Sequence, residues 1–477
     1  MPTRSVSATL ATALLTLPAF GQILPGHSIA VVRVTGQPGE MYDIDHEAGT
    51  ASQLVLSAAL AAETPNCVLM DNAATGFVGT SPAGTGNVYS IVVAGNTVIE
   101  SQLNTTATAG ANVAQLVHVG TRIYFCTQDA GGALGILQSV PDTGGPVTTE
   151  LDLSTLGATG LANACCAIGT YVYVATFNSS PANSATSPGE IFVYDTVSST
   201  GQLVMNLPPG GFAPLGNPWN TGIVNMVQDP QAPGMLVLQG VYGDILHVDP
   251  ATPASVTSSV WTGVMNAGGN ALASGSVDSF AFDPVAGDWI VGTREGTIER
   301  WVGDQQAEDK IVGLGTNPTA TSNRVAGLHY FPVSTTPADV SYGLGCEGNE
   351  GWTPTDSSFG APVAGSTGFR FGLFSANPGD LVVLLLDFQN VTIGGVPLPA
   401  DLTGLGAPGC FVRTGNLFSQ FLVTGGSGAG GGQATIPLAL PANMTGLSFY
   451  RQWAELQATP TNGLGIVVSN ARQLTVL

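Results

Sequence analysis

The sequence predicts an all-β protein, a six-bladed β-propeller followed by a β-sandwich. Short alternating apolar strands, each led by a glycine, recur six times, and the leading glycines are 46 to 57 residues apart. A repeat of this length without helical periodicity between the copies is typical of four-stranded propeller blades. The 64 glycines and 31 prolines suit many short strands joined by tight turns. The leading glycines are Gly39, Gly86, Gly132, Gly189, Gly243 and Gly296.

The first copy lacks an inner strand, and a spare strand after the last copy can supply it. Residues 28–34, 40–44 and 53–56 match only the second, third and fourth strands of a blade. Residues 324–332, with the sequence RVAGLHYFP, lie where a seventh inner strand would begin. Pairing this strand with residues 28–34 closes the ring and removes two open sheet edges. Closure predicts six blades, and seven is the alternative because the 57-residue step has room for another pair of strands.

The repeats end near residue 332, and the chain divides into four segments. Residues 1–21 have the pattern of a signal peptide, with Arg4, an apolar stretch at 8–17 and small residues at the cleavage position. Residues 22–332 are the predicted propeller, and residues 333–340 form a short polar linker. In residues 341–477 the repeat disappears, and seven or eight short strands with glycine-rich turns predict a β-sandwich.

The charge of the chain excludes several kinds of partner. It has 32 acidic and 11 basic residues, a net charge of −21, and Lys310 is its only lysine. Nucleic acid and anionic membranes need clustered Lys and Arg, whereas the ten arginines are scattered singly along the sequence. After residue 21 no apolar run approaches the roughly 18 residues of a membrane span. We therefore expect a secreted or cell-surface protein whose ligand, a protein or a glycan, is extracellular.

The six cysteines agree with an oxidising compartment. Cys67, Cys126, Cys165 and Cys166 fall in the propeller, and their pairing stays open. Each of the adjacent Cys165 and Cys166 is either a small buried side chain or bonded to a neighbouring blade. None has a partner at zinc-ligand spacing, so no metal site is predicted. Cys346 and Cys410 both fall in the C-terminal segment, where a bond between them would be internal to one domain.

Three motifs stand in the C-terminal segment: YGLGC at 342–346, DLTGLGAPGC at 401–410 and YRQW at 450–453. Together they resemble a C-terminal module that recurs in exported proteins of some environmental bacteria, attached to varied N-terminal domains. The resemblance covers about 135 residues and implies a shared appendage for surface retention or sorting, with paired cysteines. It carries no catalytic residues. On this basis we expect a disulfide between Cys346 and Cys410.

Candidate ligand contacts lie where the predicted inner strands open onto the central channel. Aligning these strands places Asn66, Gln115, Ala164, Val224 and Asp278 at one level. The predicted ligand-binding residues are the three polar ones, Asn66, Gln115 and Asp278. One carboxylate and two amides are few for Ca²⁺, which takes six or more oxygen ligands. No cofactor is therefore predicted, and a Ca²⁺ ion is kept as the alternative.

No catalytic residue emerges from the sequence. None of the five histidines has a nucleophile motif beside it, and no G-x-S-x-G elbow is present. The arginine cluster and the Asp-box turns of sialidase-like propellers are not visible either. The sequence therefore favours a binding or interaction platform over an enzyme. The alternative is an extracellular propeller hydrolase or lyase that acts on lactones or glycans.

Overall fold

The computed structural model describes residues 22–477 apart from short internal gaps, and the predicted signal peptide, residues 1–21, lies outside the described residues. The described chain is all-β, with only helix α2 (Ala58–Ala62) and the 3-10 helices η1 (Leu153–Leu156) and η3 (Thr403–Leu405) beside the strands. Within it, no helix has the length and apolar character that crossing a membrane requires. The gaps are 35–37, 82–85, 111, 129–134, 178–188, 207–222, 231, 233, 241–244, 252–255, 260–276, 295, 302–308, 315–322, 335–337, 349–352, 427–429 and 459–461.

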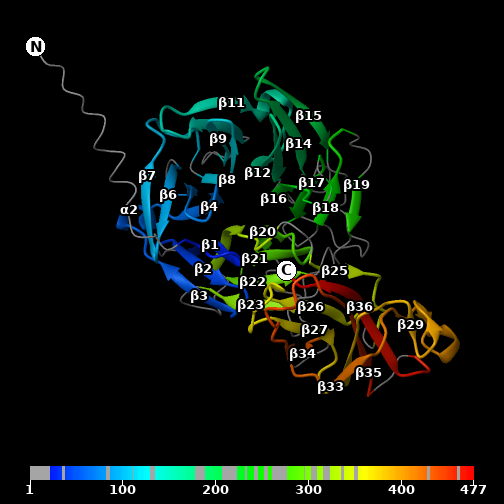
Figure 1. Ribbon diagram of the computed structural model, residues 1–477. Coiled ribbons are helices and arrows are strands. Elements are labelled where there is room, and N and C mark those ends of the chain that lie inside the picture. The colour runs from blue at the N-terminus through cyan, green and yellow to red at the C-terminus, as the bar shows by residue number, and fades with distance from the viewer. Residues whose placement is uncertain are drawn as a thin grey trace, which may run out of the picture.

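The first two thirds of the described chain form six four-stranded antiparallel sheets, which we call the ring. The sheets are arranged around a common axis, with one strand of each nearest to it (Figure 1). These inner strands are β4, β8, β12, β16, β20 and β24. From the inner strand outwards, the strands of each sheet are β24 (Asn323–Tyr330), β1 (His27–Val34), β2 (Glu40–Asp45) and β3 (Thr50–Leu54); β4 (Pro65–Met70), β5 (Thr75–Thr80), β6 (Val88–Ala94) and β7 (Thr97–Gln102); β8 (Asn112–Val119), β9 (Arg122–Gln128), β10 (Ile136–Pro141) and β11 (Thr148–Asp152); β12 (Leu161–Ile168), β13 (Tyr171–Phe177), β14 (Glu190–Asp195) and β15 (Thr200–Asn206); β16 (Ile223–Gln228), β17 (Leu236–Gly240), β18 (Ile245–Val248) and β19 (Val256–Ser259); β20 (Val277–Asp283), β21 (Asp288–Thr293), β22 (Thr297–Trp301) and β23 (Asp309–Gly313).

Apolar cores between neighbouring sheets hold the ring together. Ile29 and Met41 of the first sheet pack with Val78 and Ile91 of the second. Each sheet of the ring has a neighbouring sheet on either side, so both of its faces are covered. Strand β21, for example, is buried at all six positions. This explains why its sequence, DWIVGT, is rich in β-branched and aromatic residues on both faces rather than alternating apolar with polar residues.

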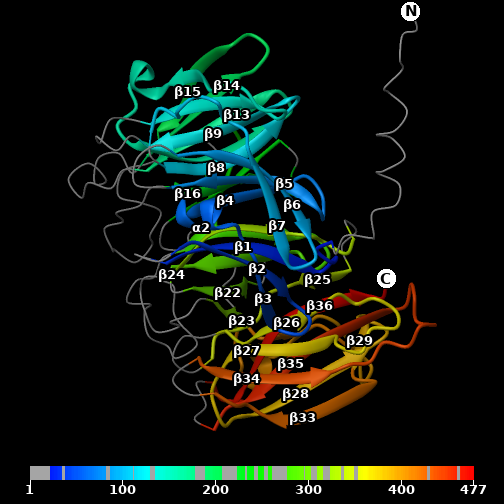
Figure 2. The same ribbon diagram turned by 90° about the vertical axis from the view of Figure 1, so that its left-hand side faces the viewer.

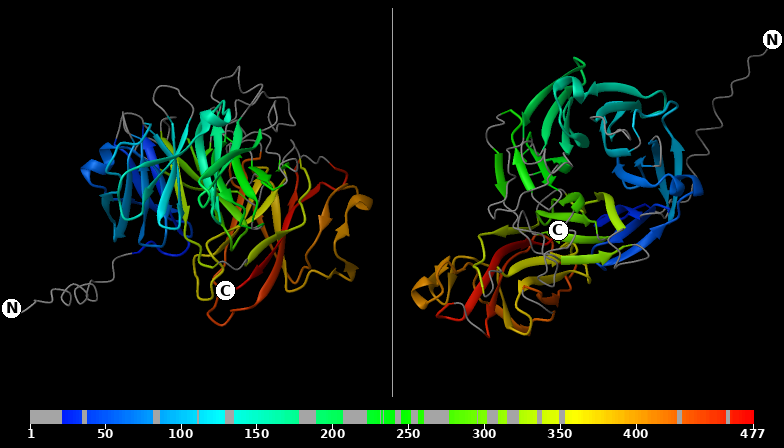
Figure 3. Two further views of the ribbon diagram at one scale, coloured as in Figure 1. Left: turned by 90° about the horizontal axis from the view of Figure 1, so that it is seen from above. Right: turned by 180° about the vertical axis from the view of Figure 1, so that it is seen from behind.

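The predicted closure of the ring is present. Strand β24 pairs antiparallel with β1, from Ser28 opposite Tyr330 to Val34 opposite Asn323. The first sheet is therefore built from both ends of the ring, and β24 lies beside β1 in Figure 3. The pairing satisfies the backbone edge that β1 would otherwise expose.

Gly327 of β24 allows close contact with the next sheet. A Cβ atom at this position would lie 2.8 Å from the Cys67 Cα atom and 2.9 Å from the Val68 backbone nitrogen. Backbone atoms cannot move aside as a flexible side chain can. We expect Gly327→Val to lower the free energy of unfolding of the ring by about 1–3 kcal/mol, measured by urea denaturation. Gly404→Val, at a position with no atom within 4 Å of the added Cβ, is the control. Equal stability of both variants would contradict tight closure.

The C-terminal part, from β25 to β36, contains two larger sheets that face each other across one apolar core (Figure 2). Phe371 and Ile436 reach this core from one sheet, and Trp453 and Leu474 from the other. The five-stranded sheet has the order β25 (Asp339–Tyr342), β36 (Ile466–Thr475), β35 (Ser448–Leu456), β28 (Leu381–Asp387) and β33 (Phe418–Val423); the three-stranded sheet has the order β26 (Thr355–Phe359), β27 (Arg370–Ala376) and β34 (Gly432–Pro437); the small pairs are β29 (Thr392–Ile393) with β30 (Val396–Pro397) and β31 (Ala400–Asp401) with β32 (Phe411–Val412).

The expected disulfide between Cys346 and Cys410 is present and joins residues 64 positions apart. Both cysteines are buried in a small apolar cluster on the outer side of the five-stranded sheet, with Val467 and Val468. The other four cysteines, all in the ring, are buried free thiols: Cys67, Cys126, Cys165 and Cys166. Burial raises the pKa of the Cys67 and Cys166 thiols, so that they stay protonated at neutral pH.

The C-terminal part is joined to the ring by buried charges. Arg472 of β36 has no exposed side-chain surface, and its Nη2 donates to the carbonyl oxygen of Ala286, in the β20–β21 turn, at 2.7 Å. Its Nη1 lies 3.4 Å from Asp288, and its Nε lies 3.2 Å from Asp339. Asp339 also binds Arg451 at 2.9 Å. Burial by itself raises the pKa of Asp339, but Arg451 and Arg472 hold that pKa far below its usual value.

Part of the predicted linker belongs to a strand of the C-terminal part. Residues 333–340 are a polar linker in the sequence-based prediction, but β25 begins at Asp339 and pairs with β36. Asp339 is fully buried because its carboxylate is the shared partner of Arg451 and Arg472. A second contact joins the C-terminal part to the ring: Ser366 donates to the side chain of Glu47, in the β2–β3 turn, and Arg370 donates to the carbonyl oxygen of Glu47.

Candidate functional site: a pocket at the mouth of the channel

Each inner strand departs from regular pairing close to its first residues. In the second sheet Pro65 pairs with Thr80 and Cys67 with Gly79, so Asn66 between them has no partner in the register. Such a β-bulge re-aims the side chain of the extra residue. The residues that occupy the equivalent bulges in the other five inner strands are Ala114 with Gln115, Asn163, Val224, Asp278 and Ala326.

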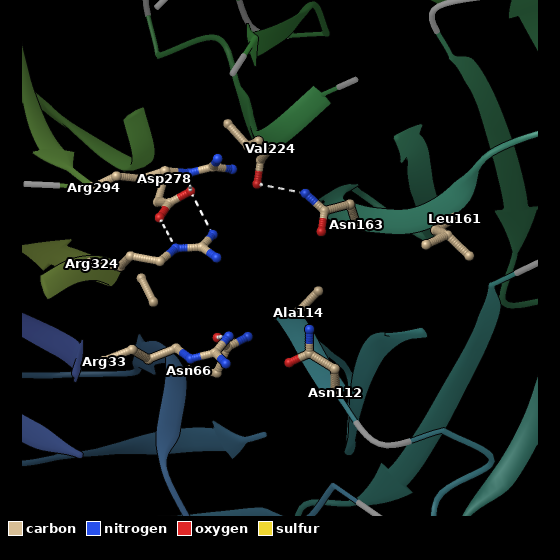
Figure 4. Close-up of a pocket in the computed structure, with 11 residues that line it drawn as sticks. Arg33, Asn66, Asn112, Ala114, Leu161, Asn163, Val224, Asp278, Arg294 and Arg324 are labelled. Atoms are coloured by element: carbon tan, nitrogen blue, oxygen red, sulfur yellow. Dashed lines mark hydrogen bonds and ion pairs between the residues drawn. The ribbon is translucent and has the colours of Figure 1, made fainter. Parts of the chain in front are cut away.

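The bulges line one pocket. A cavity of about 290 Å³ opens at the end of the channel where the inner strands begin, and we call it the mouth pocket. Three arginines, from strand β1, strand β24 and the turn after β21, complete its charged lining (Figure 4). The bulge residues that line it are Asn66, Ala114, Asn163, Val224, Asp278 and Ala326, and the arginines are Arg33, Arg294 and Arg324.

Asp278 is held between two of these arginines. Arg324 donates from Nε to one Asp278 oxygen and from Nη2 to the other, the latter at 2.8 Å. Arg294 donates from Nε to Asp278 Oδ1, also at 2.8 Å. The Asp278 side chain is only 4% exposed, whereas those of Arg294 and Arg324 are 28% and 39% exposed. The carboxylate is therefore buried beneath two guanidinium groups that remain open to solvent.

Arg33 lies next to Arg324 because their backbones are register partners in the pairing of β1 with β24. Like charges directly opposite each other on neighbouring strands repel. Arg33 Nη1 donates to Asn66 Oδ1 at 2.8 Å, a neutral acceptor that does not cancel the charge. Burial, and then the charge of Arg324, lower the pKa of Arg33, which shows that its positive charge is disfavoured here.

Amide side chains occupy the other side of the pocket. In Figure 4, Asn163 and Asn112 project from the side opposite to Arg33 and Arg324. Asn163 Nδ2 donates to the carbonyl oxygen of Ile223 on the next inner strand at 3.0 Å, and Asn66 Nδ2 donates to that of Val113 at 2.8 Å. These bonds fix the positions of the amides, because each one ties neighbouring strands together.

Deeper in the channel lies a second cavity of about 250 Å³, which Gln115 and His329 line. The amide of Gln115 is fully engaged: Nε2 donates to Asn225 Oδ1 and to the carbonyl oxygen of Met226, both at 2.9 Å, and Oε1 accepts from the Cys165 backbone. Gln115 thus ties three sheets together. Burial lowers the pKa of His329 to about 4, so its ring is neutral at physiological pH.

The predicted ligand-binding residues are only partly brought together. Asn66 and Asp278 share the mouth pocket, and Gln115 lines the deeper cavity, which Asp278 also lines. Ala164, aligned with them in the sequence, is instead buried in the core between two sheets, because the bulge at Asn163 shifts the register by one residue. The expectation of singly scattered arginines without a cluster is wrong for Arg33, Arg294 and Arg324, which the folded ring gathers around Asp278 and Asn66.

No family model matches the chain, and no curated protein matches its sequence. Among solved structures, the chain is similar to TolB from Acinetobacter baumannii, with 12% identity and a TM-score of 0.38 over 62% of this chain and 64% of that one. A protein from Lactobacillus plantarum gives 14% identity and a TM-score of 0.40 over 64% of this chain and 99% of that one. Sqt1 from Saccharomyces cerevisiae gives 12% identity and a TM-score of 0.35 over 63% and 83%. The matched part of this chain thus spans just under two thirds of the TolB structure.

Proposed function

We propose that the protein is an exported binding protein, a six-bladed β-propeller followed by a β-sandwich, with the mouth pocket as its ligand site. Six four-stranded sheets with the last strand paired to the first support the blade count. Two sheets around one apolar core support the sandwich. The Cys346–Cys410 disulfide is in keeping with an extracellular location. The C-terminal part, by its resemblance to the bacterial export module, serves in surface retention or sorting.

The observation that carries the proposal is the bulge in all six inner strands at the level of the mouth pocket. A regular ladder would bury more backbone hydrogen bonds, so six interruptions at one level work against stability. Bulges recur beside binding and active sites because they aim side chains that a regular strand would place elsewhere. Here they aim Asn66, Asn163 and Asp278 at one cavity from three rigid strands.

The bonding of Asp278 argues against catalysis and against calcium at this site. Both of its oxygens accept hydrogen bonds from arginines, which leaves the carboxylate poorly placed to take a proton from a substrate. Calcium takes several oxygen ligands, and three guanidinium groups around one carboxylate repel a divalent cation. A ligand that accepts hydrogen bonds suits the pocket better.

Filling the pocket tests this proposal. Ala326 lines the cavity, so the aromatic ring in Ala326→Phe should occupy it and abolish the binding of any ligand found on a glycan array probed with purified protein. Ala59→Phe, on the exposed face of α2, is the control. Binding that survives Ala326→Phe would overturn the assignment of the site. A panel of lactones and glycosides, assayed with and without Ca²⁺, addresses the enzyme alternative: turnover lost in Asp278→Ala would replace the binding proposal with catalysis.

A further inference from the structure

We propose that the mouth pocket recognises an oxyanion, a carboxylate, sulfate or phosphate carried by a small hydroxylated molecule such as an acidic sugar. This inference rests on the proposed ligand site and adds the chemical class of its ligand. Arg33, Arg294 and Arg324 are the groups that contact the anion, and the asparagine amides across the pocket contact the hydroxyl groups.

The first argument is the local reversal of charge. The chain has 32 acidic and 11 basic residues, yet the charged residues that line the mouth pocket, among those that the structure describes, are three arginines and one aspartate. Two positive charges are therefore in excess at the centre of a strongly acidic protein. A concave site lined by one sign of charge attracts ligands of the opposite sign, and the surrounding acidic surface leaves this pocket as the favourable place for them.

The second argument is the incomplete pairing of the guanidinium groups. Asp278 accepts from the Nε atoms of Arg294 and Arg324 and from Arg324 Nη2, and Asn66 accepts from Arg33 Nη1. Among the described residues, no further acceptor is bonded to these three side chains. The remaining N–H groups face the cavity, where the planar fork of an arginine matches the two oxygens of a carboxylate, sulfate or phosphate.

The third argument is the unfavourable arrangement of Arg33 and Arg324. The two arginines stand directly opposite each other on paired strands, and no carboxylate bridges them among the described residues. Such a pair opposes folding, and the placement is explained if a bound anion bridges both charges. Asp278 fits the same scheme, because it orients Arg294 and Arg324 from below while it occupies only part of their donors.

The size of the pocket limits the ligand. A volume of about 290 Å³ lies at the lower end of the range for small-molecule sites, which suits one sugar ring or one terminal residue of a longer glycan. Asn66 and Asn163 are held by bonds to the backbone of neighbouring strands. Their side chains are thereby held in fixed positions, as recognition of hydroxyl groups requires.

The experiment compares glucuronate, glucose 6-phosphate and glucose 6-sulfate with neutral glucose, by calorimetric titration of the purified full chain at low ionic strength. We expect at least one acidic sugar to bind while glucose does not, and added salt to weaken the binding. Arg33→Gln should weaken it by roughly tenfold to a hundredfold, as loss of a charged hydrogen-bond donor does. Arg33→Lys should recover part of the affinity, because it keeps the charge but not the fork. The acidic sugar that binds with the highest affinity identifies whether the pocket prefers a carboxylate, a phosphate or a sulfate.

Stability and a matched control separate recognition from folding. Arg33→Gln should leave the thermal midpoint unchanged or raise it, because the repulsion from Arg324 is relieved. Arg122→Gln removes a positive charge from a residue that lines neither cavity and should not change binding. Equal binding of glucose, or binding that is the same in Arg33→Gln, overturns the inference. If Ala326→Phe abolishes the binding of a ligand but Arg33→Gln leaves its affinity unchanged, the proposed binding site stands. Only the inference that the ligand is an anion then fails.

Discussion

Replacing Arg472 with methionine should lower the free energy of unfolding by about 3–5 kcal/mol, since it removes one of the two arginines that pair with each of the buried carboxylates of Asp288 and Asp339. The guanidinium group contacts Asp288 of the ring and Asp339 of the C-terminal part, and its side chain has no exposed surface. Water cannot replace the lost bonds at such a position. Calorimetry should show the change as an earlier transition of the C-terminal part, separated from that of the ring.

Two further variants make this expectation specific. Arg122→Met, in which the replaced side chain is 30% exposed, should change stability by less than about 1 kcal/mol. Arg472→Met combined with Asp288→Asn should recover part of the loss, because in the single variant the buried charge of Asp288 keeps Arg300, 3.5 Å away, but loses Arg472. If Arg472→Met is as stable as Arg122→Met, the charges do not join the two parts.

Loss of the Cys346–Cys410 disulfide should have a similarly large effect. The bond closes a loop of 64 residues, and constraint of a loop of this length in the unfolded chain corresponds to about 4 kcal/mol. The double variant Cys346→Ala, Cys410→Ala should therefore unfold its C-terminal part at a lower urea concentration, while the ring unfolds as before. Tryptophan fluorescence reports both transitions, since Trp453 is buried in that part and Trp289 and Trp301 are buried in the ring.

Reduction provides the control, because it breaks the bond without removing atoms from the cluster around Val467. Wild-type protein in reducing agent should match the double variant, and the variant itself should not respond to the reducing agent. The four buried thiols of the ring should make no difference, since a reducing agent does not alter free thiols. A reduced protein as stable as the oxidised one would contradict the expected stabilisation.

Most of the fold could be predicted from the sequence because its signals are local and repeated. A glycine followed by an alternating strand marks each sheet of the ring. The unusual pairing of β24 with β1 followed from the missing inner strand of the first copy and the spare strand at residues 324–332. The buried charges around Arg472 could not be predicted, because their members lie in the ring, at the start of β25 and in β36, and no sequence pattern connects these positions.

The candidate site was harder to predict for a related reason. Asn66 and Asp278 could be found because they stand in inner strands at equivalent positions. Arg33 and Arg324 are almost 300 residues apart and meet only through ring closure, so along the sequence each looks isolated. The predicted pairing did contain the necessary signal, since it places the end of β1 against the start of β24. Val224 was also aligned correctly, but the bulges displaced the alignment at Ala164 and Gln115, since a one-residue shift exchanges the two faces of a strand.

Closure of the ring also determines when it can form during synthesis. Ser28 and Tyr330 are partners about 300 residues apart, so the first three strands of the ring emerge long before the strand that completes their sheet. Until then β1 presents an unpaired edge that can join a second nascent chain as readily as β24. Contacts between such distant residues form slowly, and the open species is prone to aggregation. The yield of folded protein should thus depend on how quickly the last strand follows the others and on how dilute the unfinished chains are, and less on the stability of the completed ring.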